Sequence, residues 1–295
     1  MIPSAAPVAA DRLSRVHVRS CGRRVEYGDL KGLPVFALHG TPGSRLMFAL
    51  SDHAARDRGL RLIAPERPGY GLSDYRHSAT LFDHARDIAT LAEALGFERF
   101  AIIGVSGGGP YAVAVAAALP RRVTLLALVG PIADHGRQIR MSRGRRLLFG
   151  NLVRLPVALR AIFFGLRNLL HLAPELAYRG LMARVSQSDR AILARDDVKA
   201  SLRAAVFEGL RPGIEDAVQD VTLFCAPWGL PLARVYASAV LWQGSDDSIV
   251  PPEAAYWLGR TLPNCRLDVI HGAGHYWVFG QFGLVLDAVA AAMRG

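Results

Sequence analysis

A serine set among glycines is the residue best placed to do chemistry in this chain of 295 residues. The segment Gly104–Gly108 (GVSGG) follows the apolar run FAII and leads into an alanine-rich stretch with helical spacing. A tight turn from a strand into a helix raises its central side chain above the edge of a sheet, and glycine at both flanks leaves room for the two backbones to pass. The pattern predicts that Ser106 is a nucleophile, with a purely structural turn as the alternative.

Backbone amides that could stabilise an oxyanion are expected at two places. The amide of Gly107 lies at the start of the predicted helix, where free N–H groups and the helix dipole favour negative charge. The loop His39–Ser44 (HGTPGS) follows another apolar run and would supply the amide of Thr41. Phosphate binding is the competing interpretation of both loops, but neither G-x-x-x-x-G-K-[ST] nor G-x-G-x-x-G occurs in the chain.

The elements that must position these loops follow from the hydrophobic pattern. Two short alternating runs, at 16–18 and 24–27, predict an opening hairpin. Continuous apolar runs predict strands buried on both faces at 35–39, 60–66, 100–105, 123–130, 239–244 and 266–272. Helical spacing predicts helices over 81–95, 107–119, 253–262 and 279–293. The alternation predicts an α/β fold with a mostly parallel eight-stranded sheet flanked by helices.

One interval breaks this alternation. From 132 to 237 no run predicts a strand, whereas helical spacing recurs over 145–155, 156–172 and 174–185. We predict an all-helical lid over residues 132–237. The lid would be inserted into a core made of residues 1–131 and 238–295, and it would lie over the edge of the sheet.

Charge and apolar surface are unevenly distributed over this insertion. Arg160, Arg167 and His171 share one face of the helix 156–172, and apolar residues occupy its other faces. That apolar surface either packs on the sheet, lines a substrate site or contacts a membrane. The net charge is +10, and the segment 134–184 holds ten arginines against two acidic residues. We interpret this excess as a solvated surface, with weak contact to an anionic membrane surface or an acidic substrate as the alternative.

Several protein classes are disfavoured by composition. No nucleic-acid-binding motif accompanies the arginines, so nucleic acid is not an expected partner. Cys21, Cys225 and Cys265 lie far apart, which argues against a disulfide scaffold or a zinc site. Residues 1–15 lack a cationic start and contain two prolines, which predicts a disordered tail and not a signal peptide. No apolar stretch is long enough to predict a membrane span, and we expect a cytoplasmic protein.

Five segments together resemble the α/β-hydrolase fold superfamily. They are HGTPGSR (39–45), PERPGYGLSD (65–74), GVSGGGPYA (104–112), LWQGSDDSIVP (241–251) and HGAGHYW (271–277). These motifs are specific for the fold and for serine catalysis, and they name no substrate-binding residue. Glu66 departs from the aspartate that the family usually carries in D-R-x-G-x-G-x-S, and we expect this change to affect the anchoring of the loop and not the chemistry.

The resemblance implies the partners of Ser106. The family pattern G-x-x-D-x-x-V-P is matched by Gly244, Asp247, Val250 and Pro251. It implies that Asp247 is the orienting acid, whereas Asp246 is interpreted as a loop-capping side chain. The GAGH motif places His275 in the position of the base, and His39 and His271 are interpreted as structural. The order Ser, Asp, His along the chain is the one this fold uses.

The expected reaction is hydrolysis of an ester or similar acyl bond. Ser106, His275 and Asp247 would work through an acyl-enzyme intermediate on a small, apolar acyl substrate. This chemistry needs no metal and no organic cofactor. Serine at the elbow argues against the haloalkane dehalogenase and epoxide hydrolase branches of the superfamily, which use aspartate there.

Other activities use the same residues and stay open. They are acyl transfer, hydrolysis of a carbon–carbon bond and cofactor-free peroxidation. An aminopeptidase is disfavoured, because its lid would carry acidic residues for the substrate amine and this lid is rich in arginine. The non-enzymatic alternative is a receptor that binds a ligand without turnover. The sequence predicts no oligomeric state.

Overall fold

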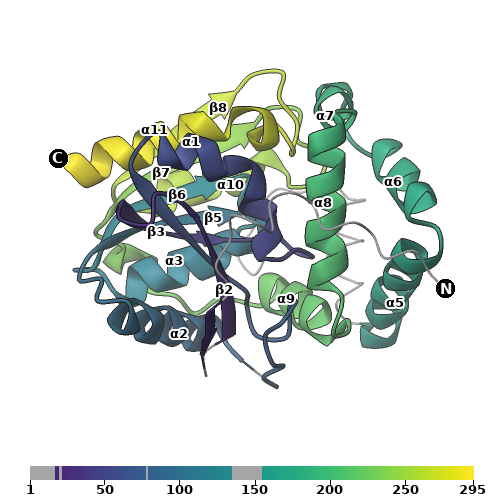
Figure 1. Cartoon of the computed structure of the whole chain (residues 1–295), viewed down its shortest axis with the longest axis horizontal. Helices are drawn as coiled ribbons and strands as arrows, with labels where there is room; N and C mark the ends of the chain where they lie inside the picture. Colours follow the sequence, from purple (N-terminus) through teal and green to yellow (C-terminus); the bar gives the residue numbers. More distant parts are fainter. Residues whose placement is uncertain (1–16, 20–21, 78, 135–154) are drawn as a thin grey trace.

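The computed structural model describes residues 17–19, 22–77, 79–134 and 155–295, and its eight strands form one sheet in the order β1-β2-β4-β3-β5-β6-β7-β8 (Figure 1). The strands are β1 (His17–Arg19), β2 (Gly22–Gly28), β3 (Leu33–Leu38), β4 (Leu60–Pro65), β5 (Phe100–Val105), β6 (Val123–Val129), β7 (Ser238–Gly244) and β8 (Cys265–Ile270). β2 is antiparallel to both β1 and β4, and every other pairing is parallel. The predicted mostly parallel eight-stranded sheet is confirmed.

Helices cover both faces of the sheet (Figure 1). One face carries α2 (Leu81–Ala94), α3 (Gly109–Ala118) and α10 (Pro252–Thr261), and the other carries α1 (Asp52–Arg56) and α11 (Val278–Arg294). Within β3, Phe36 and Leu38 are buried on the first face and Val35 and Ala37 on the second. Burial on both faces is why the central strands are continuous apolar runs in the sequence.

The predicted boundaries of the core elements agree with the observed ones to within about two residues at most ends, and two of the differences concern the candidate site. Residues 106–108 form a separate 3₁₀ turn, η3 (Ser106–Gly108), before α3 begins. Strand β8 ends at Ile270, so His271 lies beyond it and is exposed. A 3₁₀ turn at a helix N-terminus is common, and here it tightens the bend between β5 and α3.

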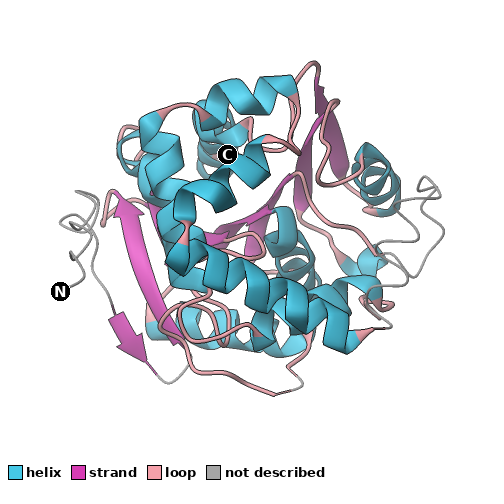
Figure 2. Ribbon diagram, turned by 90° about the vertical axis from the view of Figure 1, so that its right-hand side faces the viewer, coloured by secondary structure: helices cyan, strands magenta, loops and turns pink. Residues whose placement is uncertain are grey.

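Five α-helices and a short 3₁₀ helix, η4 (Leu232–Arg234), lie between β6 and β7 in the described chain. The α-helices are α5 (Pro156–Leu172), α6 (Pro174–Met182), α7 (Gln187–Leu193), α8 (Asp196–Gly209) and α9 (Glu215–Cys225). Figure 2 shows this helical insertion in front of the sheet. Proline at the first position of α5 and of α6 fits a helix start, where its missing N–H needs no partner. The helix predicted over 145–155 falls almost entirely on residues outside the described chain, and the lid boundaries at 132 and 237 stay a prediction.

The apolar residues of α5 pack mainly on other helices and not on the sheet. Leu159 and Phe163 are buried against Tyr70, Leu210 and Val218, which belong to the loop after β4 and to the end of α8 and α9. This small apolar cluster therefore joins helices of the insertion to one another and to the loop after β4.

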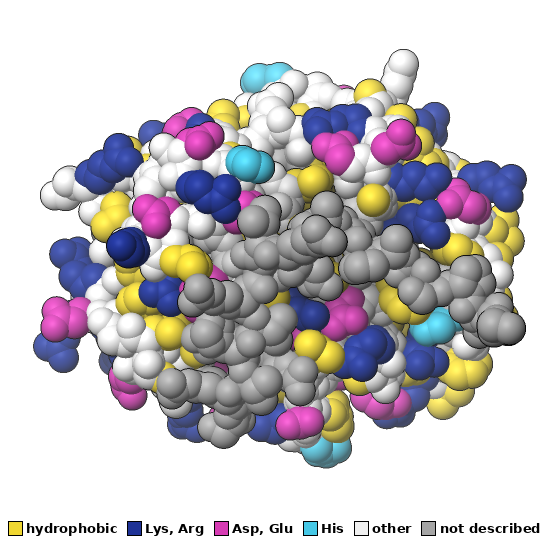
Figure 3. All heavy atoms as spheres, viewed as in Figure 1, with side chains coloured by type: hydrophobic (Ala, Val, Ile, Leu, Met, Phe, Trp, Pro, Cys, Tyr) yellow, Lys and Arg dark blue, Asp and Glu magenta, His cyan; other side chains and the backbone are white. Residues whose placement is uncertain are grey.

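Most of the basic segment cannot be located on the surface, because six of its ten arginines lie within 135–154, outside the described residues. Of the others, Arg160 forms an exposed ion pair with Glu215, at 2.8 Å. On the face seen in Figure 3, basic side chains lie among acidic and apolar ones. No helix of the described residues is long and apolar enough to cross a membrane.

Candidate active site

The turn between β5 and α3 holds Ser106 in a strained conformation. Its φ of 51° is the only positive value at a non-glycine residue in the described chain, and such strain is typical of functional turns. A Cβ at Gly104 would lie 2.8 Å from the Cβ of Ala112, and one at Gly108 would lie 2.3 Å from the carbonyl oxygen of Leu38. Glycine is therefore required at both positions for helix and strand to approach.

Ser106, His275 and Asp247 form a continuous hydrogen-bonded chain. The Ser106 hydroxyl lies 3.1 Å from Nε2 of His275, and Nδ1 of His275 lies 2.7 Å from Oδ2 of Asp247. The other carboxylate oxygen of Asp247 accepts the amides of Ile249 and Val250, each at 2.8 Å. The structure thus brings together three residues that are up to 169 positions apart in sequence.

The electrostatics of this chain favour an ionised acid beside a basic imidazole. Burial lowers the pKa of His275, but the charge and hydrogen bond of Asp247 outweigh it, and the charge of Asp189 adds to them, so the pKa lies above the usual histidine value. Burial raises the pKa of Asp247, but the charge of His275 and the hydrogen bonds that Asp247 accepts lower it below the usual value. A carboxylate in this state can stabilise an imidazolium.

The alternative candidates for the acid and the base, Asp246 and His39, are not part of this hydrogen-bonded chain. Asp246 is exposed and accepts a hydrogen bond from Ser245 Oγ, at 2.7 Å. His39 is fully buried, and its Nδ1 donates to the carbonyl of Gly40, at 2.8 Å. Burial and the charge of Arg67 hold the pKa of His39 well below its usual value, so its imidazole is neutral and shapes the loop.

Thr41 and Gly107 lie against each other beside Ser106. A Cβ at Gly107 would lie 2.4 Å from Oγ1 of Thr41 and 3.1 Å from its backbone nitrogen, so no side chain fits there. The Thr41–Pro42 peptide bond is cis. A Cβ at Gly209, at the end of α8, would lie 2.2 Å from the carbonyl oxygen of Gly43, so the insertion also touches this loop, backbone against backbone.

The buried ion pair between Arg67 and Asp220 fixes the loop 39–44 that contains Thr41. Arg67 Nη2 donates to Oγ1 of Thr41 at 2.8 Å and to Oδ2 of Asp220 at 2.7 Å, and Arg67 Nη1 donates to the carbonyl of His39. Asp220, in α9, also accepts the hydroxyls of Thr41 and of Tyr70, at 2.6 and 2.7 Å. Burial lowers the pKa of Arg67, but Asp220 outweighs this and raises it. The Arg67 guanidinium is therefore charged, and both of its terminal nitrogens are hydrogen-bonded.

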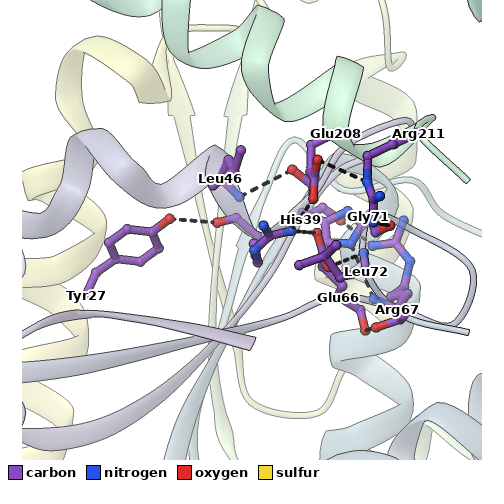
Figure 4. A network of polar contacts seen from close by, with 12 residues as sticks. Tyr27, His39, Leu46, Glu66, Arg67, Gly71, Leu72, Glu208 and Arg211 are labelled. Carbon is purple, nitrogen blue, oxygen red and sulfur yellow. Dashed lines mark hydrogen bonds and ion pairs between the residues drawn. The ribbon is translucent and has the colours of Figure 1, made fainter. Parts of the chain in front are cut away.

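Glu66 anchors the loop after β4 through its side chain. Figure 4 shows its side chain among the neighbours of this loop, where it accepts the amide of Leu72 at 2.8 Å and pairs with Arg45. Arg45 also forms an ion pair with Glu208 of α8, at 2.8 Å. A Cβ at Gly71 would lie 1.9 Å from Oε1 of Glu66, so the chain folds closely around this carboxylate.

The sequence pattern does not single out Asp189 or Asp220, although both reach the site from the insertion. Asp220 and Thr41 are 179 residues apart, and Asp189 and His275 are 86 apart. Neither aspartate lies in a local motif. Residues 187–225 hold seven acidic residues, so residue type alone neither singles out these two nor identifies their partners.

An apolar cavity of about 200 Å³ lies over Ser106. The apolar side chains on its wall include Leu166 and Leu170 of α5, Ala177 and Leu181 of α6, and Leu202 and Val206 of α8. His275, the candidate base, and Thr41 border the same cavity. Such a shape suits an apolar group held next to the serine hydroxyl.

Among the described residues that line this cavity, Arg203 is the only arginine and none is acidic. Its guanidinium pairs with Glu175, at 2.5 Å. Within the described chain, no group of three or more His, Cys, Asp and Glu side chains is arranged to hold a metal ion. That the chemistry needs no cofactor stays a prediction.

Comparisons with known proteins agree with this architecture. Residues 35–288 match the model of the Alpha/beta hydrolase family. A curated relative, the 2-hydroxymuconate semialdehyde hydrolase of Pseudomonas putida, is 26% identical over 290 residues, which cover 92% of this chain and 90% of that protein.

Solved structures of similar shape include two bacterial proteins. The alpha/beta hydrolase fold protein from Nakamurella multipartita superposes with a TM-score of 0.67 at 23% identity, over 95% of this chain and 99% of its own. An esterase from Exiguobacterium antarcticum has a TM-score of 0.66 at 18% identity, over 92% and 96% of the two chains. At these identities the likeness shows the fold.

Proposed function

Because this chain belongs to the α/β hydrolase family, we propose that it is a serine esterase that cleaves small, apolar acyl esters. The observation that carries the proposal is the hydrogen-bonded chain from Asp247 through His275 to Ser106, with distances of 2.7 and 3.1 Å. Its serine borders an apolar cavity and lies at the start of a helix, next to Thr41 and Gly107. Nucleophile, base, acid and oxyanion donors are thus available at one point.

In acylation, Nε2 of His275 accepts the hydroxyl proton of Ser106 while Oγ attacks the ester carbonyl carbon. Asp247 stabilises the imidazolium, and the amides of Thr41 and Gly107 donate to the oxyanion. The imidazolium then donates its proton to the alkoxide oxygen as the carbon–oxygen bond breaks, and the alcohol leaves.

In deacylation, His275 removes a proton from water as the water oxygen attacks the acyl carbonyl. The second tetrahedral intermediate is held by the same amides. The proton passes to Oγ of Ser106 when the bond to the serine breaks, and the carboxylic acid leaves.

The cavity supports a neutral acyl group of modest size. Its described walls are mainly Leu, Val, Ala and aromatic side chains, and its volume is about 200 Å³. Burial of each methylene against such walls stabilises the complex by about 0.8 kcal/mol. Esters with a short or medium alkyl or an aromatic acyl group therefore fit the site better than long-chain or charged ones.

The test is activity on p-nitrophenyl esters of graded chain length, with Ser106→Ala as the variant. We expect kcat to fall about a million-fold, because the three residues act as a unit. Ser248→Ala is the matched control, since this exposed serine donates to the carbonyl of Arg184 and not to the base. Ser106→Ala protein with unchanged activity on every cleavable ester would overturn the proposal.

A fluorophosphonate probe separates an enzyme from a binding protein. An activated Ser106 is labelled covalently, and the adduct is located by mass spectrometry of the labelled peptide. Absence of labelling, together with tight binding of a small ligand, would favour the receptor interpretation.

Hydrolysis of a carbon–carbon bond is the second candidate, and a curated relative favours it. The name 2-hydroxymuconate semialdehyde denotes an acid aldehyde without an ester, so a hydrolase for it must cleave a carbon–carbon bond. Such a substrate is an anion, whereas Arg203, the one arginine on the described cavity wall, is already paired with Glu175. Turnover of this semialdehyde at a higher kcat/KM than any ester would reverse the assignment.

A further inference from the structure

Asp189 of helix α7 is completely buried against the loop that carries His275. One carboxylate oxygen accepts the backbone amide of His275, and the other accepts the amide of Tyr276, each at 2.7 Å. A carboxylate that accepts two neighbouring amides fixes both the position and the orientation of the peptide between them. The helical insertion thus holds the backbone of the base itself.

Two neighbouring residues, Ser186 and Gly274, restrict the position of the Asp189 carboxylate. Ser186 caps α7 by accepting the amide of Asp189, at 3.2 Å, and so fixes the start of the helix. A Cβ at Gly274 would lie 2.1 Å from Oδ2 of Asp189 and 2.3 Å from Oγ of Ser186. Gly274 of the GAGH motif is therefore required for the carboxylate to reach the two amides.

We propose that Asp189 is a positioning residue for the hydrolytic reaction, which holds His275 in line with Ser106 through the backbone of residues 275 and 276. The inference rests on the proposed function and adds to it that a residue of the insertion contributes to the rate. The ring of His275 is oriented by the hydrogen bond that it donates to Asp247 and by the one that it accepts from Ser106. Asp189 fixes the position of the backbone that carries this ring. A displacement of about 1 Å at a catalytic group can cost about a hundredfold in rate.

Asp189 also acts through its charge. The ionisable groups that face the imidazole are Asp247, Asp189 and Tyr276, and Arg203 lines the same cavity. The negative charge of Asp189 contributes to the raised pKa of His275, after the effects of burial and of Asp247. Loss of this charge lowers the pKa of His275. Because the base must be unprotonated to act, the acidic limb of the pH profile, where kcat/KM rises with pH, then moves to lower pH.

The decisive variant is Asp189→Asn, which keeps the shape but replaces one acceptor with a donor. We expect kcat for the best ester to fall about a hundredfold, KM to change little, and the acidic limb of the pH profile to shift to lower pH. The matched control is Asp197→Asn, which removes an exposed carboxylate of the same insertion that pairs with Arg195. This control should keep the wild-type rate and pH profile.

Gly274→Ala tests the same contact from the other side, because it keeps every hydrogen-bonding group and alters only their spacing. We expect a loss of kcat similar to that of Asp189→Asn, and a double variant no slower than the slower single one. Circular dichroism and thermal melts report whether each variant is folded.

Two outcomes overturn the proposal. They are a folded Asp189→Asn protein that matches Asp197→Asn in kcat and pH profile, and a rate loss without any shift of the acidic limb. A wild-type protein that hydrolyses no ester and is not labelled at Ser106 would instead refute the proposed function.

Discussion

The helical insertion has two parts that meet the rest of the molecule differently. The outer pair, helices α5 and α6, lines the cavity with apolar side chains and leaves others of the same kind exposed, namely Val157, Ile162, Phe164, Leu172 and Leu176. The inner helices, α7, α8 and α9, send buried or half-buried charged groups into the loops of the core. The difference indicates that the inner helices hold the loops that carry the candidate catalytic residues, whereas the outer pair, together with α8, lines the cavity.

Removing Asp220 from the inner helices should have the largest effect. Asp220→Ala leaves Arg67 buried without its partner, which costs about 3 to 5 kcal/mol of unfolding free energy. It also frees the loop at Thr41, so we expect kcat to fall about a hundredfold. Urea unfolding and ester kinetics measure the two effects.

The matched control for Asp220→Ala is Glu215→Ala, on the same helix but in an exposed ion pair with Arg160. Solvent screens such a pair, and no measurable loss of stability or rate is expected. Equal losses in the two variants would remove the basis for separating the inner helices from the outer pair.

Asp216, another buried carboxyl of the inner helix α9, should make the stability of the protein depend on pH. Burial, followed by the charge of Asp220, raises the pKa of Asp216 from 3.8 to about 7. Between these values the folded protein binds more protons than the unfolded chain, so this carboxyl destabilises the fold as pH rises from 3.8 to about 7. Asp216→Asn should therefore match the wild type at pH 4 and exceed its stability at pH 8. The full shift corresponds to about 4 kcal/mol, and because solvent reaches part of this carboxyl we expect a gain of about 2 kcal/mol.

Chemical denaturation at pH 4 and pH 8 checks this, with Glu215→Gln as the control for loss of a nearby exposed carboxylate. An Asp216→Asn protein whose advantage is the same at both pH values would contradict the raised pKa. The sign of the effect is opposite to that of an ordinary paired carboxylate, whose stabilisation is lost on acidification.

A substitution in the outer pair should have the smallest effect and a different character. Leu166→Ala enlarges the cavity from α5, and we expect the ratio of kcat/KM for a longer ester over a shorter one to rise about tenfold. The pH profile should not move, because no charged group of the site is touched. Leu176→Ala, at an exposed position of α6, is the control. A shift of the acidic limb in Leu166→Ala would show that the outer pair also positions the base.

Much of the fold and of the candidate site could be predicted because its signals are local. The elbow at Ser106 is defined by five consecutive residues where a strand leads into a helix. The GAGH motif that ends at His275 has four residues. Parallel strands then deliver these loops to one edge of the sheet, whatever the length of the chain between them.

The contacts made by the insertion could not be predicted in the same way. Asp189 accepts two amides, groups that every residue except proline carries, so its partners leave no mark in the sequence. Asp220 depends on the packing of α9 against the loop after β4, which helical spacing alone does not define. The packing of α5 on helices instead of on the sheet has the same origin, because periodicity shows that a face is buried but not against what.

The close approach of Gly209 to Gly43 limits how the enzyme can be remodelled. A cap grafted from another hydrolase would have to bring a residue without a side chain to this point, since any Cβ there would collide with the carbonyl of Gly43. Chimeras joined only at the two ends of the insertion would miss this requirement. Exchange of the helical insertion should therefore succeed when residues 39–44 are transferred together with it.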